Sequence, residues 1–211
     1  MFYDRHDAGK KLAFHLEKYK GKTDALVLGL ARGGVVVAFD VAKELCLPLN
    51  VIVPRKIGAP NNPELALGAI MENGEGIFNE SIIRALGVSQ KFIQQEIESE
   101  KAIAKQRANL YRKYTPLPKI QGKTVILVDD GIATGATMLS AIQGMRAEKA
   151  SVIVVAAPVA STDAYDKIKE VSDEVVCPHV KVDFMAVGQY YENFRQTDDM
   201  EVMNLLKEAS R

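Results

Sequence analysis

Short runs of consecutive apolar residues alternate with longer amphipathic stretches along this chain, and this alternation constrains its fold more than any other feature. The apolar runs, each of strand length, are residues 25–30, 49–53, 124–128, 151–157 and 174–176. The amphipathic stretches, each of helical length, are residues 34–45, 135–147 and 162–171, the last opened by Ser161 as a helix cap. Strands that are apolar on both faces are typical of parallel sheets covered by helices on both sides. The sequence therefore predicts an α/β fold with a parallel central sheet flanked by helices.

One region interrupts this alternation. Residues 65–78 contain the turn pair Asn73-Gly74, which predicts a β-hairpin. A polar helix is expected from Ser89 to about Tyr114, and its apolar side chains recur near one face at Ile93, Ile97, Ala104, Ala108 and Tyr111. We expect a single domain over residues 1–211 with a hairpin flap and a helical cap inserted at about residues 65–118. The alternative for the long stretch is a helix that lies solvated on the surface.

The composition fits a globular protein that has no general attraction to polyanions. The chain has 211 residues, 47% of them hydrophobic, and its 27 Lys and Arg balance its 27 Asp and Glu. A neutral balance favours neither nucleic acid nor an anionic membrane as a partner. The two cysteines, Cys46 and Cys177, are far apart in the sequence, which favours free thiols. No run of apolar residues is long enough to span a bilayer. Because the N-terminus also has no apolar leader, we expect a cytoplasmic protein.

The strongest chemical signal is the segment Val125 to Thr137, VILVDDGIATGAT. A buried strand brings Asp129 and Asp130 to the carboxyl edge of the sheet, where open α/β sheets bind their ligands. The following turn opens a helix, so backbone N–H groups and the helix dipole form an anion site, to which Thr134 and Thr137 add hydroxyl donors. Because two acids would repel a bare phosphate, their expected partners are ribose hydroxyls or a hard cation beside the phosphate. The segment therefore predicts a site for a phosphorylated sugar; the alternative is an Asp that caps an ordinary helix.

A second loop with phosphate-binding chemistry follows the first strand. Arg32 offers a forked cation to phosphate oxygens, while Gly33 and Gly34 allow close approach of the backbone. The alternative is a plain strand–helix turn with an exposed arginine. Gly-x-x-x-x-Gly-Lys-Ser/Thr and Gly-x-Gly-x-x-Gly are both missing from the sequence, so neither a P-loop nucleotide hydrolase nor a dinucleotide fold is supported.

With these motifs in this order, the chain resembles the type I phosphoribosyltransferases, and VILVDDGIATGAT is similar to their signature for 5-phosphoribosyl 1-pyrophosphate (PRPP). RKIGAPNNPELALGA is similar to the flexible loop of a little-characterised branch of that family. The resemblance implies that Asp129 and Asp130 bind the ribose hydroxyls, directly or through Mg²⁺, and that Arg32 and Gly33 hold the pyrophosphate. The implied 5-phosphate site is made of Gly131, Ala133, Thr134, Gly135, Ala136 and Thr137.

Residues 54–68 are expected to form an irregular loop that acts as a lid, because they contain several prolines and glycines. By the same resemblance, the cations Arg55 and Lys56 would close over the leaving pyrophosphate. Glu64 is the only acid in this loop; it would either hydrogen-bond a substrate or be an ordinary surface charge.

The resemblance weakens toward the C-terminus. The segment DFMAVG, residues 183–188, is reminiscent of the base-binding segment of purine-type members. Phe184 and Tyr191 could stack on a base or could be core aromatics. Hypoxanthine-type members have an acid that acts as general base where this chain has Ala133, whereas adenine-type members also have Ala. A proton acceptor would therefore come from elsewhere, such as the flap or the cap.

The implied activity is transfer of ribose 5-phosphate from PRPP to a nitrogenous base with release of pyrophosphate, dependent on Mg²⁺, by a homodimer. The alternative is a regulatory protein that binds PRPP or a nucleotide without catalysis.

Overall fold

The computed structural model describes residues 1–116 and 118–210, without the side chains of residues 63 and 64. Its centre is a five-stranded sheet with the order β2-β1-β6-β7-β9. The strands are β1 (Ala25–Leu30), β2 (Leu49–Ile52), β6 (Thr124–Val128), β7 (Val152–Ala156) and β9 (Glu174–Val176). Every pairing in it is parallel. The prediction of a parallel central sheet is therefore confirmed.

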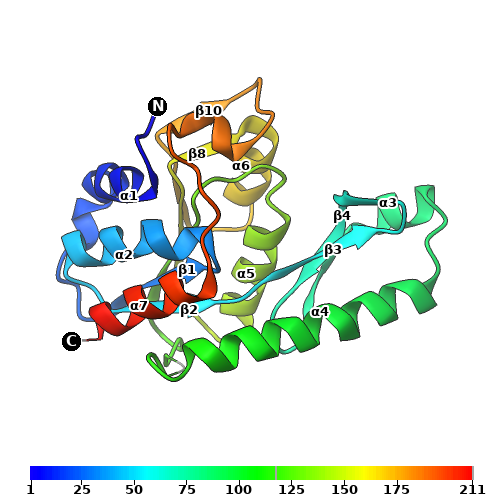
Figure 1. Ribbon diagram of the computed structural model, residues 1–211, viewed down its shortest axis with the longest axis horizontal. Coiled ribbons are helices and arrows are strands. Elements are labelled where there is room, and N and C mark those ends of the chain that lie inside the picture. The colour runs from blue at the N-terminus through cyan, green and yellow to red at the C-terminus, as the bar shows by residue number, and fades with distance from the viewer. Residues whose placement is uncertain (117, 211) are drawn as a thin grey trace.

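Helices cover both faces of this sheet (Figure 1). One face carries α1 (Arg5–Phe14), α2 (Gly33–Leu45) and α7 (Asp199–Ala209), and the other carries α5 (Ala136–Ala147) and α6 (Thr162–Lys169). Alternate residues of β6 point to opposite faces: Ile126 packs with the first group and Leu127 with the second. As predicted, Ser161 caps α6, because its side chain accepts a hydrogen bond from the N–H of Ala164 at 3.1 Å.

Beyond β2 the chain leaves the sheet and forms a projecting unit, here called the arm (Figure 1). Three antiparallel strands, in the order β3-β4-β5, and two helices make up the arm. A small apolar core, separate from the two cores of the central sheet, holds it together and includes Ile57, Leu67 and Ile93. The elements are β3 (Arg55–Ala59), β4 (Asn62–Ile70), β5 (Gly76–Phe78), α3 (Glu80–Ala85) and α4 (Gln90–Tyr111).

The expectation of an irregular loop at residues 54–68 is wrong. Those residues form β3, a turn at Pro60 and Asn61, and most of β4. The glycine and proline residues that suggested a loop belong to an irregular hairpin, whose register shifts on either side of Gly58. The hairpin predicted at residues 65–78 is confirmed as β4 and β5.

The long helix α4 is not a solvated surface helix. Its C-terminal half joins the main core through Ala104, Ala108 and Tyr111, while Ile93, in its N-terminal half, packs in the core of the arm. Just after α4, Arg112 donates to the carbonyl of Val51 at 3.0 Å and to Glu72 at 3.2 Å. The root of the arm is thus fixed to the edge strand β2.

Two short strands, β8 (Val159–Ser161) and β10 (His179–Lys181), pair beside the main sheet, and the 3₁₀ segments η1 (Glu17–Tyr19) and η2 (Val187–Tyr190) lie in connections. The N-terminal segment runs along residues 190–192: the N–H of Phe2 donates to the carbonyl of Tyr190 at 2.8 Å. Among the described residues, no helix is both long and apolar enough to cross a membrane.

Candidate functional site

Two loops meet at the carboxyl edge of the sheet. Because β1 and β6 are neighbours with Gly29 beside Val128, the loop that starts at Ala31 and the turn that starts at Asp129 emerge side by side. The sequence predicts phosphate-binding chemistry in both the Arg-Gly-Gly loop and the Asp-Asp turn, and the register of the two strands places them together. This edge is where ligands of open α/β sheets bind.

The two acids of the turn have different surroundings. Oδ1 of Asp129 accepts the N–H of Asp130 at 2.9 Å, whereas Oδ2 of Asp130 pairs with Nε of Arg5 at 2.6 Å. Burial, followed by the neighbouring charge of Asp130, raises the pKa of Asp129 well above its ordinary value. Burial also raises the pKa of Asp130, and Arg5 opposes that shift. The free site therefore holds acidic groups in surroundings that disfavour their negative charge.

The glycines of the first loop are required by these acids. A side chain on Gly34 would place its Cβ 2.7 Å from the carbonyl oxygen of Val128, and one on Gly33 would collide with Asp130. The backbone of the Arg-Gly-Gly loop therefore packs directly against the carboxylates of the Asp-Asp turn. This leaves no room for any residue but glycine at either position. From the sequence, these glycines are expected to allow the approach of a ligand, and the structure adds this packing reason.

The two helices that start at this edge lack side-chain caps. Helices α1, α3, α4, α6 and α7 each begin at an Asp, Asn or Ser side chain that accepts a backbone N–H. In the described part of the chain, α2 and α5 have no such cap, and they begin after Arg32 and Gly135. In the first turn of α2 the N–H of Val35 donates to the carbonyl of Arg32 at 3.1 Å, and in that of α5 the N–H of Ala136 makes only a long contact of 3.5 Å with Oγ1 of Thr134. The N–H groups that have no side-chain cap are suited to another acceptor, as in phosphate sites at helix N-termini.

The turn from Gly131 to Thr137 is firmly held. Ile132 exchanges backbone hydrogen bonds with the chain at β8, and the carbonyl of Ala133 accepts the hydroxyl of Ser161 at 2.6 Å. Gly135 has a φ of +78°, a conformation that favours glycine, and it leads directly into Ala136 and Thr137 in the first turn of α5. All six residues assigned to a 5-phosphate site therefore lie on one continuous turn at the helix start.

The predicted cations are placed differently. Arg32 is half-buried at the start of α2, and its side chain makes no hydrogen bond or ion pair with the described residues. Arg55, at the start of β3, donates from Nε to Glu100 of α4 at 2.5 Å, so in this conformation it holds the arm together. Lys56 is half-buried on β3. The prediction for Glu64 falls on a side chain outside the described part of the structure.

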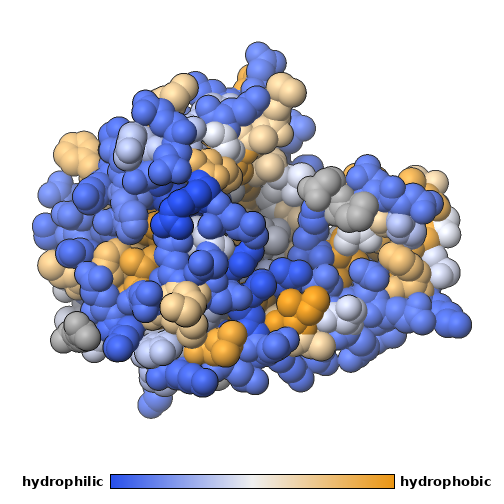
Figure 2. Space-filling model, in the orientation of Figure 1, coloured by the Kyte–Doolittle hydropathy of each residue, from blue (hydrophilic) through white to orange (hydrophobic). Residues whose placement is uncertain are grey.

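A cleft of about 760 Å³ lies between the arm, the first turns of α5 and α6, and Figure 2 shows the hollow between the two masses of the molecule. Leu65, Phe78 and Ile82 of the arm form an apolar wall. The opposite wall combines Leu139 with the charged residues Asp163 and Lys167. The cleft reaches the phosphate turn, because Ala133, Thr134, Ala136 and Phe184 also line it.

The two candidate stacking aromatics have separate roles. Phe184 lines the cleft and stacks on Tyr190 with ring centroids 5.4 Å apart. Tyr191 is buried, and its hydroxyl donates to the carbonyl of Asp130 at 2.5 Å. It therefore supports the Asp-Asp turn and is not available to stack on a base. Arg5 is a site residue that the sequence reasoning missed, since nothing in the sequence connects it with a carboxylate 125 positions away.

Asp129 and Asp130 are a suitable pair for one hard cation. Among the residues that the structure describes, no group of three or more His, Cys, Asp or Glu side chains could hold a metal ion. Mg²⁺ typically takes one or two protein carboxylates and completes its shell with water and substrate phosphates. A half-buried pair of acids whose ionisation is disfavoured by desolvation matches that pattern, and a cation would relieve the unfavourable charge.

Comparison with known proteins agrees with this architecture. The family model described as the phosphoribosyl transferase domain matches residues 3–193. The Mycobacterium tuberculosis protein named "Putative phosphoribosyl transferase Rv0571c" is 42% identical over 211 residues, which are 100% of this chain and 47% of that protein. The chain thus spans about half the length of the curated relatives that it matches.

Two solved structures are similar in fold. The crystal structure of TT1426 from Thermus thermophilus is 42% identical, each chain is covered to 98%, and the TM-score is 0.82. The AQ2163 protein from Aquifex aeolicus is 10% identical, with 84% of this chain and 74% of that chain covered and a TM-score of 0.51, and it shows similarity of fold alone.

Proposed function

This chain belongs to the phosphoribosyltransferase family, and on that premise we propose that it binds PRPP and transfers its ribose 5-phosphate to a nitrogenous base, releasing pyrophosphate. The observation that carries this proposal is the pair of uncapped helix starts, α2 and α5, on either side of the acid pair. PRPP carries a 5-phosphate and a 1-pyrophosphate separated by a ribose, and the edge offers two anion sites separated by two carboxylates.

The residues then have distinct roles. The N–H groups and hydroxyls of the turn from Gly131 to Thr137 hold the 5-phosphate. Asp129 and Asp130 accept hydrogen bonds from the ribose hydroxyls and hold Mg²⁺. The ion, when bound, neutralises phosphate oxygens. The side chain of Arg32, which has no hydrogen-bonding or ion-pair partner among the described residues, donates to the pyrophosphate and stabilises the charge that develops as it departs.

The acceptor enters through the cleft, which has the size and the mostly apolar lining of small-molecule sites. Phe184 and Phe78 line the cleft and are the proposed stacking partners of a flat base. Ala133 cannot take a proton, but among the described side chains two carboxylates also line the cleft: Glu80 of the arm and Asp163 of α6. We assign the proton acceptor to one of these two, which agrees with the expectation that it comes from the flap or from elsewhere around the site.

Closure of the arm would complete the site. Arg55 and Lys56 lie on β3, at the root of the hairpin, and in the proposed closed form they approach the leaving pyrophosphate. For Arg55 this requires exchange of its Glu100 partner for phosphate oxygens. Glu64 remains proposed as a substrate-binding residue. Closure would exclude water, which otherwise hydrolyses the reactive sugar.

The decisive experiment incubates the protein with PRPP, Mg²⁺ and a panel of nucleobases and related nitrogen acceptors, and measures pyrophosphate release. Turnover that depends on one acceptor establishes the transferase. PRPP binding by calorimetry without turnover on any acceptor would favour the non-catalytic regulator instead. Failure to bind PRPP at all would overturn the transferase, and failure to bind a nucleotide as well would overturn the regulator.

A further inference from the structure

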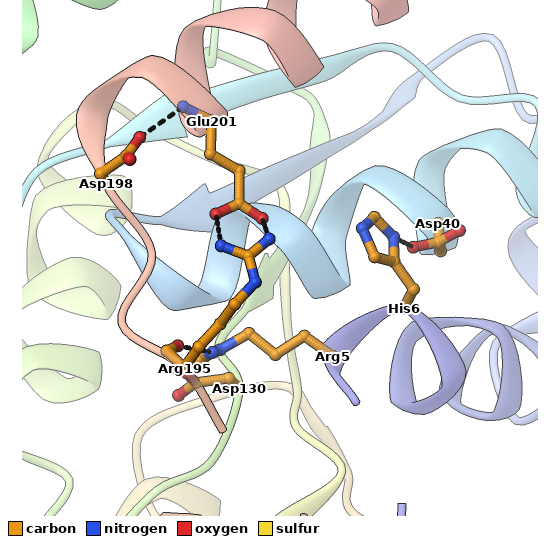
Figure 3. A network of polar contacts seen from close by, with 7 residues as sticks. All are labelled: Arg5, His6, Asp40, Asp130, Arg195, Asp198 and Glu201. Carbon is orange, nitrogen blue, oxygen red and sulfur yellow. Dashed lines mark hydrogen bonds and ion pairs between the residues drawn. The ribbon is translucent and has the colours of Figure 1, made fainter. Parts of the chain in front are cut away.

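Arg5 makes three contacts at once at the acid pair, and Figure 3 draws its partners Asp130 and Arg195. Its Nε donates to Oδ2 of Asp130 at 2.6 Å, its Nη1 donates to the carbonyl of Arg195 at 2.7 Å, and its guanidinium lies 3.9 Å from the centre of the Phe194 ring. The side chains of Arg5 and Asp130 are only 10% and 14% exposed. This is a fixed planar arrangement and not a loose surface pair.

The contacts join three distant parts of the chain. Arg5 is the first residue of α1, Asp130 follows β6, and Arg195 lies in the segment before α7. The guanidinium of Arg195 is itself held by Glu201 through two bonds of 2.8 and 2.9 Å, which fixes the carbonyl that Arg5 uses (Figure 3). The side chain and the backbone of Asp130 are therefore both held by terminal segments, since Tyr191 donates to its carbonyl.

The position of Arg5 points to the ligand site. A Cβ built on Gly33 would lie 2.9 Å from Nε of Arg5, so the guanidinium lies against the Arg-Gly-Gly loop as well as against the acid turn. A buried ion pair contributes little net stability on average, because the desolvation of both charges offsets their attraction. Its clearest physical effect here is to fix the orientation of one carboxylate.

We propose that Arg5 is a positioning residue of the ribose site: it holds the carboxylate of Asp130 in the orientation that receives the ribose hydroxyls of the ligand. This inference rests on the proposed function. If it is correct, α1 and the segment before α7 contribute to ligand binding, although neither belongs to the Arg-Gly-Gly loop or to the Asp-Asp turn.

The test measures calorimetric affinities for ribose 5-phosphate, PRPP with Mg²⁺, and pyrophosphate without metal. Arg5→Lys is the informative variant, because it keeps the charge and loses the planar fork. We expect Arg5→Lys to weaken ribose 5-phosphate and PRPP at least fivefold while pyrophosphate stays within twofold, and Arg5→Ala to weaken the two ribose ligands at least tenfold. Arg146→Ala is the matched control, because it removes an arginine–aspartate pair of 2.8 Å with Asp173, outside the site, and should change none of the three.

The outcomes separate this inference from the proposed function. If the wild-type protein does not bind PRPP, the proposed function fails. If it binds PRPP and Arg5→Lys binds all three ligands as the wild type does, Arg5 has no positioning role. A uniform loss for all three ligands, with a lowered melting temperature, would show that Arg5 only supports the fold, and this also overturns the inference.

Discussion

A Cβ built on Gly33 would lie 2.1 Å from Oδ2 of Asp130, well inside any permitted contact. The backbone of the Arg-Gly-Gly loop thus packs directly against a carboxylate of the Asp-Asp turn. The relative position of the two proposed anion sites depends on this contact, since nothing larger than hydrogen fits between them.

Gly33→Ala should therefore displace Asp130 or the loop and weaken PRPP binding by at least tenfold. The rest of the sheet is unaffected, so the circular dichroism spectrum should remain that of the wild type. Gly144→Ala, in the middle of α5, is the control, because the neighbour of its Cβ is the flexible side chain of Met71 at 3.2 Å. Wild-type PRPP affinity in Gly33→Ala would contradict the geometry described here.

Asp129→Asn should stabilise the ligand-free protein while it weakens binding. The folded-state pKa of Asp129 is raised by burial and by Asp130, so its contribution to stability is present below its unfolded pKa of 3.8 and is lost as pH rises through the folded value. Asp129→Asn should thus melt at a higher temperature than the wild type, and this difference should grow from about pH 4 toward neutrality. Each kcal/mol gained in the free energy of unfolding raises the melting temperature by about 2–4 °C. A constant difference across this pH range would argue against a strained carboxylate.

The double variant Asp129→Asn with Asp130→Asn removes both charges from the proposed ribose and Mg²⁺ site. We expect the affinity for PRPP with Mg²⁺ to fall well below that of Asp129→Asn alone, because the amide is a poor ligand for a hard cation. Titration calorimetry measures this directly. Equal affinity in the wild type and the double variant would place the ligand elsewhere.

Arg32→Ala should impair ligands that carry pyrophosphate more than it impairs nucleoside monophosphates. A lost charge-assisted hydrogen bond costs about 1.5–3 kcal/mol. The 5-phosphate turn at the start of α5 is a separate site and should be unchanged. Comparison of PRPP and a monophosphate in the same variant provides the internal control, and equal losses for both would show that Arg32 has a structural role.

Hydrogen exchange should distinguish a closing arm from a rigid one. In the free protein the backbone of residues 55–70 is hydrogen-bonded in a hairpin, and we expect slower exchange there when PRPP and Mg²⁺ are added. Exchange in the main sheet, for instance in β6, serves as the reference. The same protection in β3 and β4 with and without ligand would leave Arg55 and Lys56 without a closing role.

Local signals predicted the central fold well. The strands β1, β6 and β9 have the predicted bounds because uninterrupted apolar runs with abrupt polar ends are typical of such buried strands. The hairpin β3–β4 was mistaken for a loop because Pro60 and the nearby glycines look alike in a turn and in a loop, and only the pairing partners distinguish the two.

The candidate site could be predicted only where its residues are close together in the sequence. The motif that holds Asp129 to Thr137 indicated the anion turn because strand, acids and helix start follow one another. Arg5 and Tyr191 reach the same turn from opposite ends of the chain, so only the fold reveals them. Their contacts form only when α1 and the C-terminal segment pack against the sheet, and no local sequence pattern predicts that packing.

The separate core of the arm has a consequence for how proteins of this shape diversify. Its apolar residues pack among themselves, and the arm joins the rest of the molecule through α5, the C-terminal half of α4 and the root at Arg112. We expect substitutions on its inner wall, such as at Phe78 or Ile82, to be absorbed within that small core, because sites without shared partners act independently. If the cleft binds the acceptor as proposed, acceptor preference would then change by substitutions in the arm, or by exchange of the whole arm, while the proposed sugar-phosphate site stays the same.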